Sequence, residues 1–353
     1  MKTGKSISEL ALEIERQHRT KVDYIADTRK LEVVPTETGV KLQLHNGSDI
    51  DLSVNDLCHS QIGERVGIPA KYYQKMLAGD TELLAYNVNR WFQRAPEKRL
   101  VRTLDGVGRA FLSDIYRRID NLQIAETSLP VLAQVPGIEF VSAEITERRM
   151  YIKAVTSAVQ STLDTRRVGD VVRAGVIIQN SEVGLGAVSV FPFYDFLACL
   201  NGMVRTKDGM RVAHIGTQNE EATYGVLAND TKSAIDHALV LRIRDQVKAA
   251  FDPTTFNEAI AMMQAQTQQQ VTGSPVKAIE VLGNDFGLLE GEKDSVLRHL
   301  ITGGDLSRYG LMNAITRTAE DATSYDRATE IETMGGRLLD LPRSSWDRIA
   351  VAA

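Results

Sequence analysis

Cysteine and aromatic residues are scarce in this chain of 353 residues: it has two cysteines, and aromatic residues make up 6%. Two cysteines, Cys58 and Cys199, are too few for a disulfide framework, so we expect buried thiols in a reducing compartment. The six histidines are scattered, and only Cys58 and His59 are neighbours. Adjacent residues alone chelate poorly, so we predict no metal site and no cofactor.

Long hydrophobic runs are also missing. The longest mainly apolar stretch, Val183–Leu200, is interrupted by Gly184, Gly186, Pro192 and Asp195. A membrane-spanning helix needs about 20 apolar residues. The N-terminus is charged and amphipathic, without the apolar core of a secretory signal. We therefore expect a cytoplasmic protein with no membrane partner.

The composition is that of an ordinary globular protein, with 43% hydrophobic and 25% charged residues. This balance predicts a packed core. The formal net charge is −5, and the acidic excess lies in the C-terminal part, where residues 251–353 hold nine basic against fifteen acidic residues. The rest of the chain is nearly neutral, so the total charge does not by itself exclude a nucleic-acid partner.

The pattern of apolar residues predicts an α+β fold, with an antiparallel-rich central sheet flanked by helices and a helical C-terminal module. We expect a second helix to begin at Ser53 and Asp56, a capping pair. Elsewhere the spacing predicts a helix over Ser8–Arg19, a hairpin within residues 31–44, strands across Arg102–Val204 and a helix over Thr231–Phe251.

The clearest change in composition is the glutamine-rich segment Gln264–Pro275, which ends in turn residues. Such a segment offers few side chains for a core, so we predict a linker there. The chain then divides into an α+β domain (1–263), a linker (264–276) and a C-terminal helical module (277–353).

Several segments together resemble a phage/plasmid-like family of uncharacterised proteins, a domain of unknown function carried on prophages, plasmids and other mobile elements. They are Gly67–Tyr73, Val101–Asn121, Asn180–Gly186 with Cys199–Met203, and Asn313–Thr316 with Asp326–Glu330. One departure is visible, because the family usually reads Leu-Ser-Asp-Arg-Tyr where this chain has Ile115 in the arginine place.

The resemblance implies a protein of a mobile element, located in the host cytoplasm if a phage encodes it. It implies no reaction, cofactor or catalytic residue. A biochemical hypothesis must therefore come from the residues themselves.

Basic and aromatic residues alternate between Arg90 and Arg118, where eight basic residues stand against three acids. Single-stranded nucleic acid needs cations for its phosphates and flat rings for its bases. We therefore predict a single-stranded DNA site from this segment and a second basic patch. Its residues are Arg90, Trp91, Arg94, Arg99, Arg102, Arg109, Tyr116, Arg117, Arg118, Lys153, Arg166 and Arg167.

Two other interpretations of these segments stay open. The rings can be core residues and the arginines a solvated rim paired with local acids. Residues Leu57–Leu77 have the spacing of a helix-turn-helix, but many helical hairpins share it without touching DNA, so core packing is the default there.

Catalytic signatures are lacking. Gly106 and Gly108 precede Arg109 instead of the third glycine of a dinucleotide loop, and the turn with Gly184 and Gly186 is more typical of a hairpin than of a phosphate nest. No acid and base pair stands out, so an unrecognised enzyme is the least expected class.

We therefore expect a DNA-binding protein that acts on single strands in recombination, annealing or replication and forms a homo-oligomer. The alternative is a non-enzymatic protein-interaction or host-defence-countering factor of a mobile element, whose acidic C-terminal part contacts a basic partner.

Overall fold

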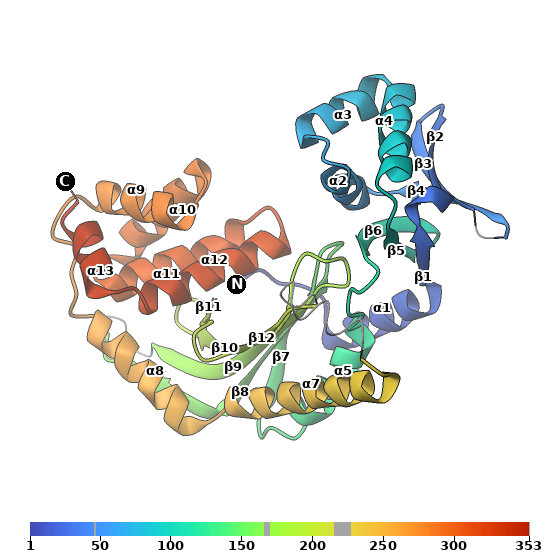
Figure 1. Cartoon of the computed structure of the whole chain (residues 1–353). Helices are drawn as coiled ribbons and strands as arrows, with labels where there is room; N and C mark the ends of the chain where they lie inside the picture. Colours follow the sequence, from blue (N-terminus) through green and yellow to red (C-terminus); the bar gives the residue numbers. More distant parts are fainter. Residues whose placement is uncertain (46, 166–169, 215–226, 353) are drawn as a thin grey trace.

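The structure is a computed structural model that describes residues 1–45, 47–165, 170–214 and 227–352. It contains two sheets of largely antiparallel strands with helices on their faces, so the predicted α+β class is confirmed (Figure 1). In Figure 1 the first sheet and its helices lie at the upper right, the second sheet at the centre, and the C-terminal helices at the left.

The chain opens with helix α1 (Ile7–Thr20), which begins at a capping box formed by Ser6 and Glu9. The first sheet follows, in the order β1-β5-β6-β4-β3-β2. Its strands are β1 (Val22–Asp27), β2 (Leu31–Thr36), β3 (Gly39–His45), β4 (Asp49–Val54), β5 (Lys98–Leu104) and β6 (Val107–Ser113), with a short 3-10 helix, η1 (Thr28–Lys30), between β1 and β2. The predicted hairpin is the antiparallel pair β2 and β3, and only β4 and β6 pair in parallel among the described strands of this sheet.

Three helices cover one face of this sheet: α2 (Asp56–Arg65), α3 (Ala70–Gly79) and α4 (Thr81–Arg94). Their apolar residues form one core with the sheet, around Leu42, Val88 and Phe111. The expected cap of the second helix was wrong: Asn55 caps α2, whereas Ser53 belongs to β4. The side chain of Asn55 accepts a hydrogen bond from the Cys58 amide, which places the cap after the strand has ended.

The second sheet has the order β11-β10-β9-β8-β7, with β12 paired to β10. Its strands are β7 (Ile138–Ile145), β8 (Met150–Thr162), β9 (Val171–Asn180), β10 (Val188–Phe196), β11 (Asn201–Val204) and β12 (Met210–Val212). All its pairings are antiparallel. The strands expected across Arg102–Val204 therefore include β7 to β11.

Helices lie on both faces of the second sheet. On one side are α5 (Asn121–Leu132), α7 (Asn229–Ala249) and α8 (Pro253–Gln266), and Figure 1 shows α7 and α8 running beneath the strands. The predicted stripe on α7 buries Leu239, Ile243 and Val247. On the other side, α12 (Tyr325–Leu339) packs on β11.

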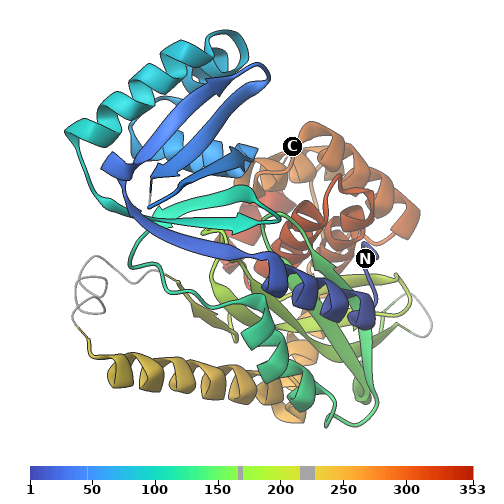
Figure 2. The same ribbon diagram turned by 90° about the vertical axis from the view of Figure 1, so that its right-hand side faces the viewer.

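The remaining C-terminal elements are α9 (Pro275–Phe286), α10 (Glu290–Gly303), α11 (Arg308–Thr318), the 3-10 helix η2 (Ala319–Asp321) and α13 (Arg343–Ala350). The helical character expected after residue 277 is therefore present. Figure 2 shows these helices gathered beside the second sheet, and Figure 1 shows them apart from α2, α3 and α4.

The glutamine-rich segment makes more contacts than its composition indicated. Gln266 is buried and donates to the Leu339 carbonyl at 2.8 Å, and Val271 is buried with its amide bonded to the Leu306 carbonyl. Apolar residues before and after this segment belong to a single buried cluster. Two residues of the segment are therefore anchored, and the Gln266 amide satisfies a carbonyl group at the end of α12. The three-part division of the chain remains a prediction.

Both cysteines are buried, and burial raises the pKa of Cys58 to about 12. In the described ranges, no helix has the length and apolar character needed to cross a membrane.

Candidate nucleic-acid interface and buried charge network

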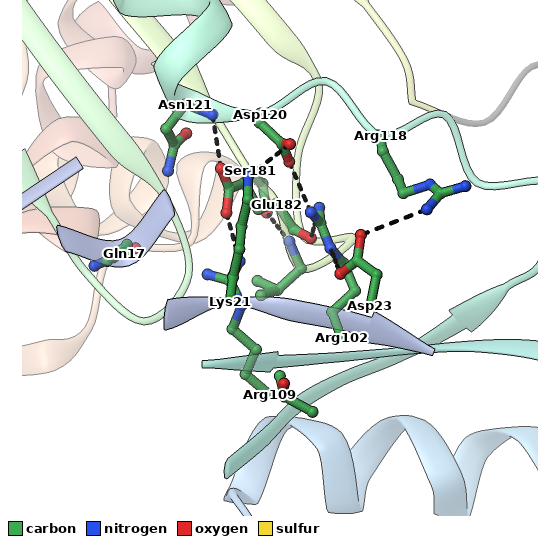
Figure 3. Close-up of polar contacts among 12 residues, drawn as sticks. Gln17, Lys21, Asp23, Arg102, Arg109, Arg118, Asp120, Asn121, Ser181 and Glu182 are labelled. Carbon is green, nitrogen blue, oxygen red and sulfur yellow. Dashed lines mark hydrogen bonds and ion pairs between the residues drawn. The ribbon is translucent and has the colours of Figure 1, made fainter. Parts of the chain in front are cut away.

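A connected polar cluster lies where the first sheet meets the second half of the chain (Figure 3). At its centre is Arg102 on β5, whose side chain is 0% exposed. Its guanidinium donates to Asp23 of β1 at 2.9 Å, to Asp120 before α5 at 2.7 Å, and to the Glu182 carbonyl at 3.0 Å. A buried charge is tolerated only with such partners.

Neighbouring charges complete the network. The Glu182 carboxylate accepts from Arg109 of β6 at 2.5 Å and from the Asn121 amide at 2.7 Å, and Lys21 pairs with Asp120 at 2.6 Å. Figure 3 shows these side chains converging from β1, β5, β6, the start of α5 and the connection between β9 and β10. Three cations and three carboxylates thus tie together segments that are far apart in the sequence.

Tyr116 extends the network. Its hydroxyl donates to the Ser181 carbonyl at 3.0 Å, and its ring stacks on His214 with the ring centres 5.0 Å apart. Burial raises the pKa of Tyr116, so the phenol stays protonated at neutral pH. The chain segments whose sequence carries the family resemblance, Val101–Asn121 and Asn180–Gly186, meet here. Their side chains hold the two halves of the molecule together.

Four of the predicted DNA-binding residues are therefore misassigned as surface groups: Arg102, Arg109, Tyr116 and Lys153 are all buried. Lys153 of β8 pairs with Glu332 of α12 at 2.5 Å, and both side chains are 0% exposed. These groups already have partners and cannot reach a phosphate. The count of basic and aromatic residues failed because these side chains lie in covered parts of the molecule, where carboxylates and carbonyl groups of distant segments satisfy them.

Arg99 and Arg117 are mostly covered. Arg99 lies over the Phe111 ring at 5.1 Å, and Arg117 pairs with Asp236 of α7 at 2.6 Å. Arg118 is exposed and lies 3.7 Å from Asp23. Arg166 and Arg167 fall outside the described residues.

The remaining three predicted residues, Arg90, Trp91 and Arg94, lie together on the exposed side of α4. Trp91 is 45% exposed, and the guanidinium of Arg94 lies 5.7 Å from its ring centre. In the described part of the chain, neither Arg90 nor Arg94 forms an ion pair with a carboxylate. The opposite side of α4 buries Leu84, Ala85, Val88 and Phe92 against the sheet.

The sequence prediction left Tyr86 of α4 out of the site, and it also left out the exposed residues of α3. Tyr86, one turn before Arg90, is 67% exposed. The helical spacing of Tyr86, Arg90 and Arg94, opposite an apolar stripe, is the signal that could have selected them from the longer basic segment. The preceding helix, α3, also exposes Lys71, Tyr72 and Lys75. We call the exposed residues Lys71, Tyr72, Lys75, Tyr86, Arg90, Trp91 and Arg94 the α3/α4 surface.

The helical hairpin expected within Leu57–Leu77 is present as α2 and α3, with Gly67 in the left-handed conformation at φ 72° between them. Its apolar residues pack into the core of the first sheet, and Tyr73 contacts His59 through its hydroxyl at 3.0 Å. Packing therefore accounts for the spacing, while the exposed residues of α3 add to the α3/α4 surface.

Comparisons of this chain with models of known families, with curated proteins and with solved structures gave no match. The resemblance to the phage/plasmid-like family therefore remains an expectation, and functional arguments depend on the geometry alone. No three His, Cys, Asp or Glu side chains gather as a metal-binding group within the described ranges.

Proposed function

We propose that this chain binds single-stranded DNA through the α3/α4 surface. The observation that carries the proposal is the exposed side of α4, where Tyr86 and Trp91 stand beside Arg90 and Arg94. These arginines have no carboxylate partner among the described residues, so they remain available for phosphates.

The chemistry of an unpaired strand fits this surface. Base stacking on an aromatic ring contributes about 1–3 kcal/mol per base and tolerates any sequence. Arginine and lysine neutralise phosphates and release counterions, which makes affinity depend on salt. The rings of Tyr86 and Trp91 are not needed to hold α4 in place, because the buried side of the helix packs on the sheet.

The surface is short, because the 14 residues of α4 span only about 20 Å. One copy therefore contacts few nucleotides. We propose that several copies assemble along a strand, as expected for a protein that promotes recombination, annealing or replication in the cytoplasm of a host that carries a mobile element.

Fluorescence anisotropy with a labelled oligonucleotide across a salt series tests the proposal. Arg90→Ala with Arg94→Ala should weaken binding and flatten the slope of log affinity against log salt, by up to about 0.7 for each phosphate that the protein no longer neutralises. Trp91→Ala should weaken binding with almost no change of slope, because stacking releases few counterions.

Arg343→Ala is the matched control, since the Arg343 side chain is 93% exposed on α13, far along the chain from α4. It should bind like the unaltered protein. All variants change exposed side chains, so their thermal unfolding should stay the same. The proposal fails if the folded, unaltered protein shows no measurable affinity for single strands at about 50 mM salt, where phosphate binding is strong.

A second candidate, a protein-interaction factor, is favoured by exposed apolar residues in the acidic C-terminal part. Leu289 and Ile301 are 65% and 69% exposed. If single strands do not bind and Ile301→Ser abolishes a concentration-dependent association measured by sedimentation, this candidate takes first place.

A further inference from the structure

A polar groove of about 350 Å³ lies between the second sheet and α12, away from the α3/α4 surface. One side is lined by Arg149, which directly precedes β8, and by Tyr151 and Gln179 of the sheet. The C-terminal helices contribute Phe286, Asp326, Arg327, Glu330 and Arg337. The volume falls in the range of about 300–1,000 Å³ typical of small-molecule sites.

The groove has an excess of available positive charge. Its lining holds three arginines against two carboxylates: Glu330 pairs with Arg327 at 2.9 Å, and Asp326 accepts from the Tyr151 hydroxyl at 2.6 Å and keeps its negative charge. Arg149 and Arg337, on opposite walls, pair with no carboxylate within the described residues. Arg149 donates instead to the Leu185 carbonyl, which fixes its position without neutralising its charge.

The groove also offers a flat surface and a free amide. The guanidinium of Arg337 lies over the Phe286 ring, 4.4 Å from its centre, a cation–π contact that links α12 to α9 beside the groove. Gln179 makes no side-chain hydrogen bond in the described part of the chain, although it lines the same groove. A carboxamide both donates and accepts, which suits the edge of a nucleobase.

We propose that this groove binds a small organic phosphate of the mononucleotide class. Arg149 and Arg337 bind the phosphate, the plane of Arg337 supports the base, and Gln179 hydrogen bonds to the edge of the base. The assignment does not depend on DNA binding by the α3/α4 surface.

Isothermal titration of the full chain with AMP, with ribose 5-phosphate and with adenosine tests each part. AMP should bind more tightly than either fragment, because only AMP uses both the arginines and Gln179. Arg337→Ala should weaken AMP binding about tenfold or more, the effect of losing a charge-assisted hydrogen bond. Gln179→Ala should weaken AMP while leaving ribose 5-phosphate unchanged.

Arg343→Ala again serves as the control and should bind AMP normally. Arg149→Lys keeps a cation while removing the planar fork, so it should retain part of the affinity if the protein stays folded. Equal affinity of AMP and adenosine, equal behaviour of Arg337→Ala and Arg343→Ala, or no heat with millimolar AMP would overturn the proposal.

One further experiment tests whether the groove binds a free mononucleotide or part of a nucleic-acid strand. In the double variant that carries both Arg90→Ala and Arg94→Ala, AMP should still bind, and a single-stranded oligonucleotide should not displace it. Displacement by the oligonucleotide in that variant would show that the groove belongs to a nucleic-acid site and would overturn the mononucleotide assignment.

Discussion

Asp120 shows how a single charge is stabilised at the junction between the two halves. Burial by itself would raise the pKa of Asp120, but the nearby charges of Arg102 and Lys21 outweigh it, so the pKa lies below its usual value. The folded chain therefore holds the ionised form more strongly than the unfolded chain does. This contribution to the free energy of unfolding is complete above about pH 4 and is lost as the pH falls further.

Asp120→Asn should lower the free energy of unfolding by about 2–4 kcal/mol at neutral pH, because it leaves Arg102 with one charged partner fewer. The difference from the unaltered protein should shrink below about pH 4, where Asp120 takes up a proton in the unfolded chain before it does so in the folded one. Urea unfolding at several pH values measures it. Asp347→Asn, at a mostly exposed carboxylate, should change little. A difference that stays constant with pH would contradict the assignment of the charge to this network.

Lys153 and Glu332 form the most buried ion pair described, linking β8 to α12. Lys153→Met alone should cost about 3–5 kcal/mol, because the charge of Glu332 is left without a partner. The double change to Lys153→Met with Glu332→Leu should recover most of that loss, since apolar packing replaces both charges. Chemical denaturation measures both effects.

The same pair tests the original surface assignment of Lys153. If the folded double variant loses affinity for single strands, Lys153 contributes to DNA binding after all. Unchanged affinity agrees with its burial.

At the scale of the element, α12 depends on two adjacent glycines, Gly335 and Gly336. A Cβ atom on Gly336 would overlap the carbonyl of Val204, and one on Gly335 would overlap the Thr316 methyl group. The lack of side chains therefore lets the helix lie close to β11 and α11. Glycine is otherwise unfavourable within a helix by about 1 kcal/mol relative to alanine.

Gly336→Ala should thus destabilise the protein by about 1–3 kcal/mol, because overlap with the backbone of β11 outweighs the gain in helix propensity. Gly291→Ala in α10 is the matched control, since no atom lies within 4 Å of the added Cβ. It should be neutral or stabilising by up to about 1 kcal/mol. Thermal unfolding of the two variants separates them, and equal melting temperatures would show that α12 does not need this close approach.

Local patterns predicted several elements, but the segment Arg102–Val204, expected to be strands, also contains the helix α5. The stripe of Leu239, Ile243 and Val247 identified α7, and alternation identified β8 and β9, because these signals depend on neighbours along the chain. The parallel pairing of β4 with β6 left no such signal. The positions of Arg102 and Lys153 also depend on distant segments that supply their carboxylates, so a count of basic residues could not distinguish them from Arg90 and Arg94.

At the scale of the whole molecule, one apolar cluster runs from α1 to α13. It includes Leu10, Ile152, Ile243, Leu282 and Trp346, from both sides of Gln264–Pro275. The helices after this segment cover part of the second sheet, as the packing of α12 on β11 shows. Removing them would expose that face to water.

A fragment of residues 1–263 tests whether the predicted α+β domain is independent. Because the removed helices bury apolar groups of the second sheet, we expect the fragment to lose cooperative unfolding and to bind a hydrophobic dye such as ANS. The first sheet with α2, α3 and α4 has its own core, so its signals should persist. The fragment should therefore keep part of the single-strand affinity of the α3/α4 surface while losing the AMP site, which needs Arg337.

Near-UV circular dichroism and urea titration of the fragment measure the outcome. A monomeric fragment with one sharp transition and native near-UV signal would show that residues 1–263 fold alone, and that the shared cluster adds stability without being required.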